Sequence, residues 1–232
     1  ALNNISFKLN KGQTLGIIGK TGSGKSTIAS LICRLYDPSK GSIEINTENL
    51  KSINLENIRN NIGYVPQDVF LFSDTIKNNI LFGINDHSID DKKIIQAAVD
   101  AHVHNDIIEF PNKYDTLIGE RGVTLSGGQK QRISIARALI RDPDVLILDD
   151  CLSAVDTATE NTILNNLKPL LKKSITIIVG HRISSVSISN HILVLENGEI
   201  IESGKHKDLI LKKGVYENLN KLQFNAAKFE HP

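Results

Sequence analysis

The feature that most restricts the fold is a glycine-rich run at residues 19–27, GKTGSGKST, which directly follows the apolar residues 15–18. This order predicts a strand, a tight loop and the start of a helix. Glycines let the backbone turn its N–H groups inward around a polyphosphate, because no side chain blocks the approach. The helix would then point its positive end at the anion. The run therefore predicts a site for a nucleoside triphosphate.

Two side chains of this run are expected to contact the nucleotide or its metal ion directly. Lys25 would reach the β and γ phosphates, and the Ser26 hydroxyl would bind Mg²⁺. The alternative, a glycine-rich turn without a ligand, is disfavoured by the strand before the run and the helix after it. The residues expected to hold the nucleotide are Gly19, Thr21, Gly22, Ser23, Gly24, Lys25, Ser26 and Thr27.

A second small-residue run, LSGGQ at residues 125–129, precedes a helical pattern at residues 130–139. A turn with free backbone N–H groups at a helix start is a second anion site on the same chain. An ordinary serine-capped helix start is the alternative. The run resembles the signature motif of ATP-binding cassette (ABC) proteins, and the resemblance extends along nearly the whole chain.

The resemblance implies a partner for this second run. In the family, two subunits pack head to tail, and each phosphate loop faces the signature turn of the other subunit. The residues of this chain expected to contact the partner's ATP are then Ser126, Gly127, Gly128 and Gln129.

The apolar run at residues 145–148 ends in two carboxylates, Asp149 and Asp150. Such a run suits a buried parallel strand with its charged end at the ligand edge. The resemblance implies that Asp149 holds Mg²⁺ and that the next residue is the general base, normally a glutamate. Asp150 is one methylene shorter, and a displacement of about 1 Å at a reacting centre can cost roughly 100-fold in rate. We therefore expect slow hydrolysis at this chain's own phosphate loop, although solvated acids at a strand end are the alternative.

Two further polar residues follow apolar strand patterns. Gln67 matches the family's Q-loop glutamine, which reaches Mg²⁺ and the attacking water, whereas a glutamine after a strand is by itself ordinary surface. His181 matches the switch histidine, which hydrogen-bonds the γ-phosphate. The resemblance thus gives the catalytic set Lys25, Gln67, Asp150 and His181, and the metal set Ser26, Gln67 and Asp149.

Alternating apolar strands and helices predict an α/β fold with a parallel core. The resemblance implies a P-loop NTPase (RecA-like) core with N-terminal antiparallel β elements, beginning with a strand at residues 1–9. We expect one ABC ATPase domain over residues 1–232, with the core at 1–75 and 140–232. An inserted helical subdomain that contains the signature run is expected at residues 76–139.

The end of the chain predicts a hairpin with an Asn197–Gly198 turn and a closing amphipathic helix over residues 208–224. The chain has no methionine, so we expect it to be a segment of a longer polypeptide. The aromatic residue that stacks on adenine in the family would then lie upstream of residue 1.

The net charge of +1, with mixed signs, argues against a nucleic-acid partner. No run approaches the roughly 20 apolar residues of a transmembrane helix, and no signal peptide is recognisable.

Residues 116–122, TLIGERG, resemble the segment with which exporter-type cassettes contact the intracellular helices of the membrane domain. The apolar residues 69–73 suit the same role, although packing within the helical subdomain would also explain them. We therefore expect an ATP- and Mg²⁺-dependent domain that powers export through transmembrane domains of the same polypeptide, at the cytoplasmic face of a membrane. The alternatives are the slowly hydrolysing, regulatory half of a heterodimeric exporter and a soluble ABC ATPase of DNA repair or translation.

Overall fold

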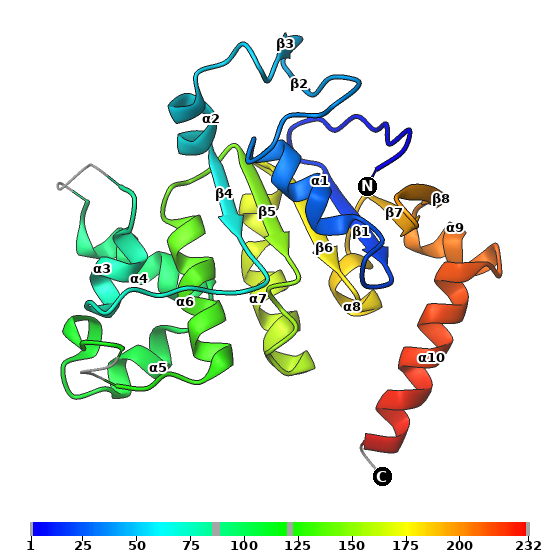
Figure 1. The fold of residues 1–232 in the computed structure, drawn as a ribbon. Coiled ribbons are helices and arrows are strands. Elements are labelled where there is room, and N and C mark those ends of the chain that lie inside the picture. The colour runs from blue at the N-terminus through cyan, green and yellow to red at the C-terminus, as the bar shows by residue number, and fades with distance from the viewer. Residues whose placement is uncertain (1, 85–88, 120–122, 231–232) are drawn as a thin grey trace.

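A six-stranded sheet with the order β4-β5-β6-β1-β7-β8 organises the molecule (Figure 1). The computed structural model describes residues 2–84, 89–119 and 123–230. Neighbouring strands run parallel from β4 to β7, and β8 is antiparallel to β7. The strands of this sheet are β1 (Thr14–Gly19), β4 (Ile62–Val65), β5 (Val145–Asp149), β6 (Ile175–Gly180), β7 (His191–Glu196) and β8 (Glu199–Gly204). The α/β fold with a mainly parallel sheet, predicted from the sequence, is confirmed.

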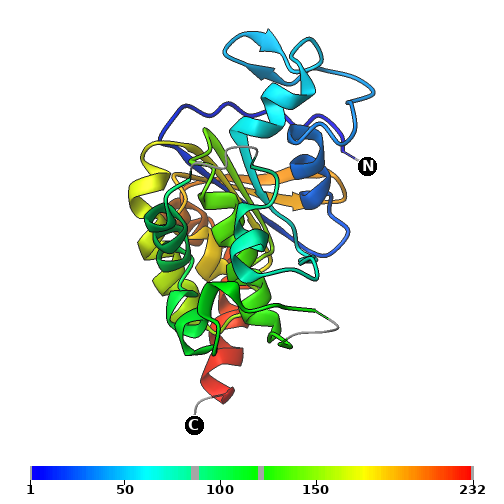
Figure 2. The same ribbon diagram turned by 90° about the vertical axis from the view of Figure 1, so that its left-hand side faces the viewer.

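The helices of the described chain are α1 (Lys25–Ile32), α2 (Leu55–Asn61), α3 (Ile76–Leu81), α4 (Asp91–Asp100), α5 (His104–Glu109), α6 (Gly127–Leu139), α7 (Thr157–Leu171), α8 (Ile183–Val186), α9 (His206–Leu211) and α10 (Val215–Glu230), with a 3-10 turn at Lys113–Asp115. A short antiparallel hairpin, β2 (Glu44–Ile45) and β3 (Glu48–Asn49), lies with α2 at one end of the molecule, and α10 extends at the opposite end (Figures 1 and 2).

Both faces of the sheet are covered, because successive side chains of a strand point to opposite faces. On β5, Leu146 and Leu148 pack into the core formed with α6 and α7, whereas Ile147 packs into the core formed with α1. On β6, Ile178 joins the first core and Ile177 the second. The continuous apolar strands of the sequence are thus explained by burial on two sides.

The carboxyl ends of the parallel strands meet at one edge of the sheet. Asp149, the last residue of β5, lies opposite Val179 of β6, and Ile18 of β1 lies opposite Gly180. Ligands of parallel α/β sheets bind at this edge. The fold therefore brings the segments after β1, β5 and β6 together.

Helices α3, α4 and α5 gather on the β4 side of the sheet, and α6 contacts both α3 and α4 (Figure 1). Arg137 of α6 donates hydrogen bonds to the backbone and side-chain oxygens of the fully buried Asn79 at 2.8 and 3.0 Å. Because α6 also contacts β4, it joins this group of helices to the sheet.

Two local predictions differ from the structure. Residues 2–9 form no strand: Asn3 donates its backbone N–H to Gly198 and its side-chain amide to Glu199 of β8, but no ladder of backbone hydrogen bonds follows. The closing helix predicted for residues 208–224 is two helices, α9 and α10. The break, at residues 212–214, contains Lys213, whose φ is 54°. The Glu202 carboxylate accepts the N–H groups of Val215 and Tyr216 at the start of α10.

The hairpin prediction is confirmed, because β7 and β8 pair on either side of Asn197 and Gly198, both at positive φ. Among the described residues, no helix combines the length and the apolar character that crossing a membrane requires.

Candidate nucleotide-binding site

At two positions of the loop between β1 and α1, the backbone conformation or its surroundings require glycine. A Cβ at Gly19 would lie 2.2 Å from the carbonyl oxygen of Leu195, so no side chain fits there. Gly24, the residue before α1, has φ 99°. No side chain caps the first N–H groups of α1, which are therefore open to an anion.

Lys25 and Ser23 present donors to the inside of this loop. The Lys25 ammonium donates to the carbonyl oxygens of Gly19 at 2.8 Å and Lys20 at 2.9 Å. Burial lowers the pKa of Lys25, and the nearby carboxylates of Asp150 and Asp149 oppose that shift. The Ser23 hydroxyl is buried and has no hydrogen-bond partner among the described residues. An unpaired buried hydroxyl is costly, and a phosphate oxygen would satisfy it.

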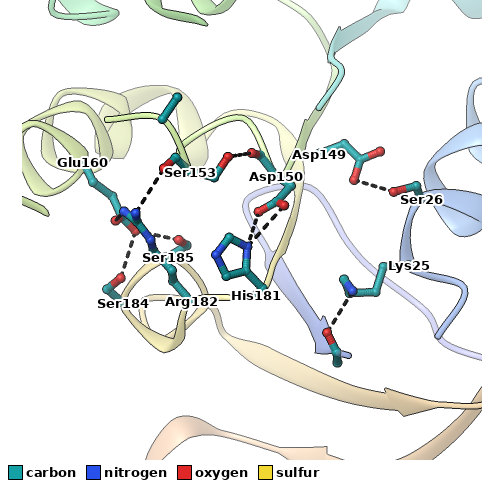
Figure 3. Close-up of polar contacts among 12 residues, drawn as sticks. Lys25, Ser26, Asp149, Asp150, Ser153, Glu160, His181, Arg182, Ser184 and Ser185 are labelled. Carbon is teal, nitrogen blue, oxygen red and sulfur yellow. Dashed lines mark hydrogen bonds and ion pairs between the residues drawn. The ribbon is translucent and has the colours of Figure 1, made fainter. Parts of the chain in front are cut away.

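Asp149 is 2% exposed at the end of β5. Its carboxylate accepts a hydrogen bond from the Ser26 hydroxyl at 3.0 Å (Figure 3). It also accepts one from the Tyr64 hydroxyl at 3.2 Å. Burial raises the pKa of the Asp149 carboxyl, while these two hydrogen bonds act in the opposite direction. Ser26 and Asp149, predicted as metal ligands, are therefore in direct contact.

Asp150 and His181 form a second polar pair at the same edge (Figure 3). The His181 ring donates from Nδ1 to the Asp150 carboxylate, with distances of 2.9 and 3.2 Å to its two oxygens. Asp150 has φ 49°, a strained conformation for a residue other than glycine. Its carboxylate faces His181, in the segment after β6 (Figure 3).

Gln67 lies two residues beyond β4 and is exposed. The structure thus brings together the phosphate loop, Asp149 and the Asp150–His181 pair. Gln67 follows β4, the outermost strand, on the side of the sheet where the parallel strands end. Among the described residues, no hydrogen bond joins its side chain to the other site residues.

The signature run opens α6, as the sequence predicts. Ser126 and Gln129 form a capping box: the Ser126 hydroxyl accepts the Gln129 N–H at 3.2 Å, and the Gln129 side chain accepts the Ser126 N–H at 3.0 Å. The expectation of free backbone N–H groups is therefore wrong for these two residues, because each satisfies the other.

Of the segment that resembles exporter cassettes, residues 120–122 lie outside the described residues, and Leu117 is exposed. Phe70 and Phe72 are exposed, and Phe72 stacks on Phe82 with 4.2 Å between ring centroids. Phe82 also lines a groove of about 320 Å³, together with residues of α2, β4, α6 and the segment that follows α1. Residues lining it are Cys33, Leu35, Arg59, Asn60, Ile62, Gly63, Tyr64, Phe82, Arg137, Ala138 and Arg141.

Sequence reasoning missed two groups of polar residues around the site. Tyr64 lies within the apolar strand that precedes Gln67, yet its hydroxyl donates a hydrogen bond to Asp149. Arg182 donates to Glu160 at 3.3 Å and to the carbonyl oxygen of Ser153 at 3.0 Å. The sequence offers one indication for each: Tyr64 places a hydroxyl within an apolar strand, and Arg182 is an arginine directly after His181.

Comparison with known proteins agrees with the geometry. The family model described as "ABC transporter" matches residues 2–153. The chain is 48% identical over 228 residues to the uncharacterised ABC transporter ATP-binding protein YknU of Bacillus subtilis, covering 98% of this chain and 39% of that protein. It is 49% identical to the probable multidrug resistance ABC transporter ATP-binding/permease protein YheI of the same organism, covering 93% of this chain and 36% of that protein.

A solved structure, that of a bacterial Atm1-family ABC exporter with ATP bound, superimposes with a TM-score of 0.90 at 40% identity. It covers 96% of this chain and 39% of that one. The chain therefore spans about two-fifths of the length of the relatives it matches. The matched family, together with the phosphate loop, the carboxylate at the end of β5 and the signature turn, establishes this chain as an ATP-binding domain of the ABC transporter family.

Proposed function

We propose that this chain binds MgATP and hydrolyses it to drive export of a substrate through attached transmembrane domains, at the cytoplasmic face of a membrane. The observation that carries the proposal is the convergence of the phosphate loop, Asp149 and the Asp150–His181 pair at one edge of the sheet. The relatives named as ATP-binding/permease proteins support the transport role.

The residues around Ser26 fit a magnesium ion. The Ser26 hydroxyl and the Asp149 carboxylate are oxygen donors in contact at 3.0 Å, and Mg²⁺ prefers oxygen ligands and few protein groups. The buried Asp149 carboxylate lies near a second carboxylate, Asp150, as well as near Lys25, so a divalent cation would add compensating positive charge. Ser26 and Asp149 would hold the ion, with Gln67 brought in from the end of β4. The ion would neutralise charge on the phosphates.

The chain's own groups would then act as follows. The first N–H groups of α1 and the Lys25 ammonium hold the phosphates. Asp150 orients the attacking water, and His181 holds the Asp150 carboxylate and reaches the γ-phosphate. Because aspartate is one methylene shorter than the usual glutamate, the carboxylate lies farther from the water, and turnover at this site is slow.

The signature turn belongs to the ATP of a second subunit in this proposal. The Ser126 oxygen accepts the Gln129 N–H, so its own O–H remains available to donate to a phosphate oxygen. Two such domains packed head to tail would each complete the other's site.

The shortened base favours a refinement of this arrangement, in which the second domain is not identical. That partner would have a glutamate after its metal-binding aspartate and a degraded signature run. The chain described here would then be the slowly hydrolysing half, whose intact LSGGQ turn completes the fast site.

The groove beside Phe82 would receive an intracellular helix of the transmembrane domain. Its wall combines apolar groups with the guanidinium groups of Arg59, Arg137 and Arg141, and Phe70 is exposed at 66% nearby. An exposed apolar patch of this kind is typical of a docking surface. The groove also borders β4, which leads directly to Gln67, so movement there would reach the nucleotide edge.

Replacement of His181 tests the catalytic part of the proposal. We expect His181→Ala to lower kcat for ATP roughly 100-fold, because a group that acts on the proton transfer contributes about that much. ATP affinity should stay within about threefold, since the loop and Lys25 hold the phosphates. Phosphate release and equilibrium titration measure the two quantities, and His191→Ala, a histidine on β7 that bonds Ser203, is the control. A collapse of both ATP and ADP affinity would instead assign His181 a structural role.

A further inference from the structure

The C-terminal helix α10 contacts the backbone that carries His181. The Gln223 side-chain amide donates to the carbonyl oxygen of His181 at 2.6 Å and accepts the N–H of Ile183 at 2.8 Å. One side chain thus pairs with the peptide groups on both sides of Arg182. Gln223 is partly buried, and α10 contacts α8 around this point.

These two hydrogen bonds satisfy groups that the segment cannot satisfy itself. Ile183 is the first residue of α8, a helix of four residues, and Arg182 before it supplies no side-chain cap. The first N–H groups of a helix have no partner within the helix. An amide offers one donor and one acceptor side by side, so Gln223 serves both peptide groups at once. Loss of such a partner leaves the segment free to shift.

The opposite side of the same segment is held by Arg182. Its guanidinium donates to the carbonyl oxygens of Ser153 and Val155, in the loop after β5, and to the fully buried Glu160 (Figure 3). The backbone at residues 181–183 therefore lies between two anchors, one on α10 and one on the loop that follows Asp150. The His181 ring meets Asp150 from this fixed backbone.

We infer that Gln223 is a positioning residue for ATP hydrolysis: its two backbone hydrogen bonds set where the His181 ring lies relative to Asp150, which makes α10 part of the hydrolytic machinery. The inference rests on the proposed function, in which His181 acts during turnover. Its physical basis is that misplacement of a reacting group by about 1 Å can cost roughly 100-fold in rate.

The test uses Gln223→Met in the purified protein. Methionine keeps the length and most of the volume of glutamine but removes both hydrogen bonds, so packing of α10 is retained. We expect kcat for ATP to fall about 10-fold while KM changes less than about twofold, because the phosphate loop is untouched. Leu222→Ala, at a neighbouring exposed position on α10, should leave both constants unchanged.

A double variant separates positioning from general destabilisation. If Gln223 acts through His181, then Gln223→Met should lower kcat in the natural background and cause no further loss in the His181→Ala background. Equal losses in both backgrounds, or no loss in the natural one, would overturn the inference while leaving the proposed function intact. If His181→Ala itself left kcat unchanged, the proposed function would fail and the inference with it, so the two failures are distinguishable.

Discussion

The phosphate loop and the signature turn are both glycine-containing starts of helices, but their first N–H groups are satisfied in different ways. At α1, Gly24 has a left-handed conformation and no side chain caps the helix. At α6, Ser126 and Gln129 cap the helix and each other. The first helix start is open to an anion, and the second is stable without one.

This difference suggests that the two helix starts have different roles toward ATP. The α1 end, with the Lys25 ammonium and the unpaired Ser23 hydroxyl, offers several donors to a polyphosphate. The α6 end offers the remaining O–H of Ser126 and the N–H groups of Gly127 and Gly128, which the capping box does not use. We therefore interpret α1 as the site that binds ATP within one chain, and α6 as a surface that contributes once a second domain supplies the nucleotide.

Lys25→Ala gives the largest expected effect. Removal of one partner from a buried charge pair costs about 2–5 kcal/mol, so ATP affinity should fall at least about 30-fold. Lys20→Ala is a matched control of equal charge on the same loop, because Lys20 is exposed and lies 3.7 Å from Glu196. It should change affinity less than about threefold. Calorimetric titration measures both, and equal effects would remove the distinction between the two lysines.

Asp150→Glu gives a smaller effect in the opposite direction. We expect steady-state hydrolysis to rise about 10-fold with ATP affinity unchanged, because the longer side chain returns the carboxylate to the attacking water. Asp144→Glu, at an exposed residue paired with Lys11, is the control. Rapid hydrolysis by the natural protein, unimproved by the substitution, would indicate that aspartate is a competent base and would favour two identical domains.

The smallest effect concerns the pH dependence of stability. Burial raises the pKa of Asp149 in the folded protein above its ordinary value of 3.8, so the folded state binds more protons than the unfolded state near that pH. The free energy of unfolding contributed by this group therefore falls as pH rises from 3.8 through the raised pKa. Asp149→Asn should remove that part of the dependence in urea unfolding without nucleotide, whereas Asp144→Asn, at an exposed carboxylate, should not. Parallel pH profiles for the natural protein and Asp149→Asn would contradict the assignment.

The main elements of the site could be predicted because each is encoded in a short run. The glycines before Lys25, the carboxylates after an apolar strand and His181 after another all follow parallel strands, whose ends converge in any such sheet. The contact between Ser26 and Asp149 follows from that convergence.

Other features depend on packing between distant segments. The Tyr64 hydroxyl reaches Asp149 only because β4 lies next to β5. Gln223 reaches the His181 backbone only because α10 packs against α8. No sequence pattern near either residue predicts this contact. The strand expected at residues 1–9 is absent from residues 2–9, because the one backbone hydrogen bond from Asn3 to Gly198 does not continue into a ladder with β8. Gly214, directly before α10, indicates a break in the helix, but the amphipathic pattern of residues 208–224 favours one continuous helix.

The central claim is that the signature turn completes a site on a second domain. Sedimentation with a slowly hydrolysed ATP analogue tests it most directly, using Ser126→Arg and, as a control, Ser42→Arg at an exposed position before β2. We predict that the natural protein and Ser42→Arg sediment as dimers, while Ser126→Arg stays monomeric and binds the analogue with unchanged affinity. An undiminished Ser126→Arg dimer would contradict the head-to-tail arrangement.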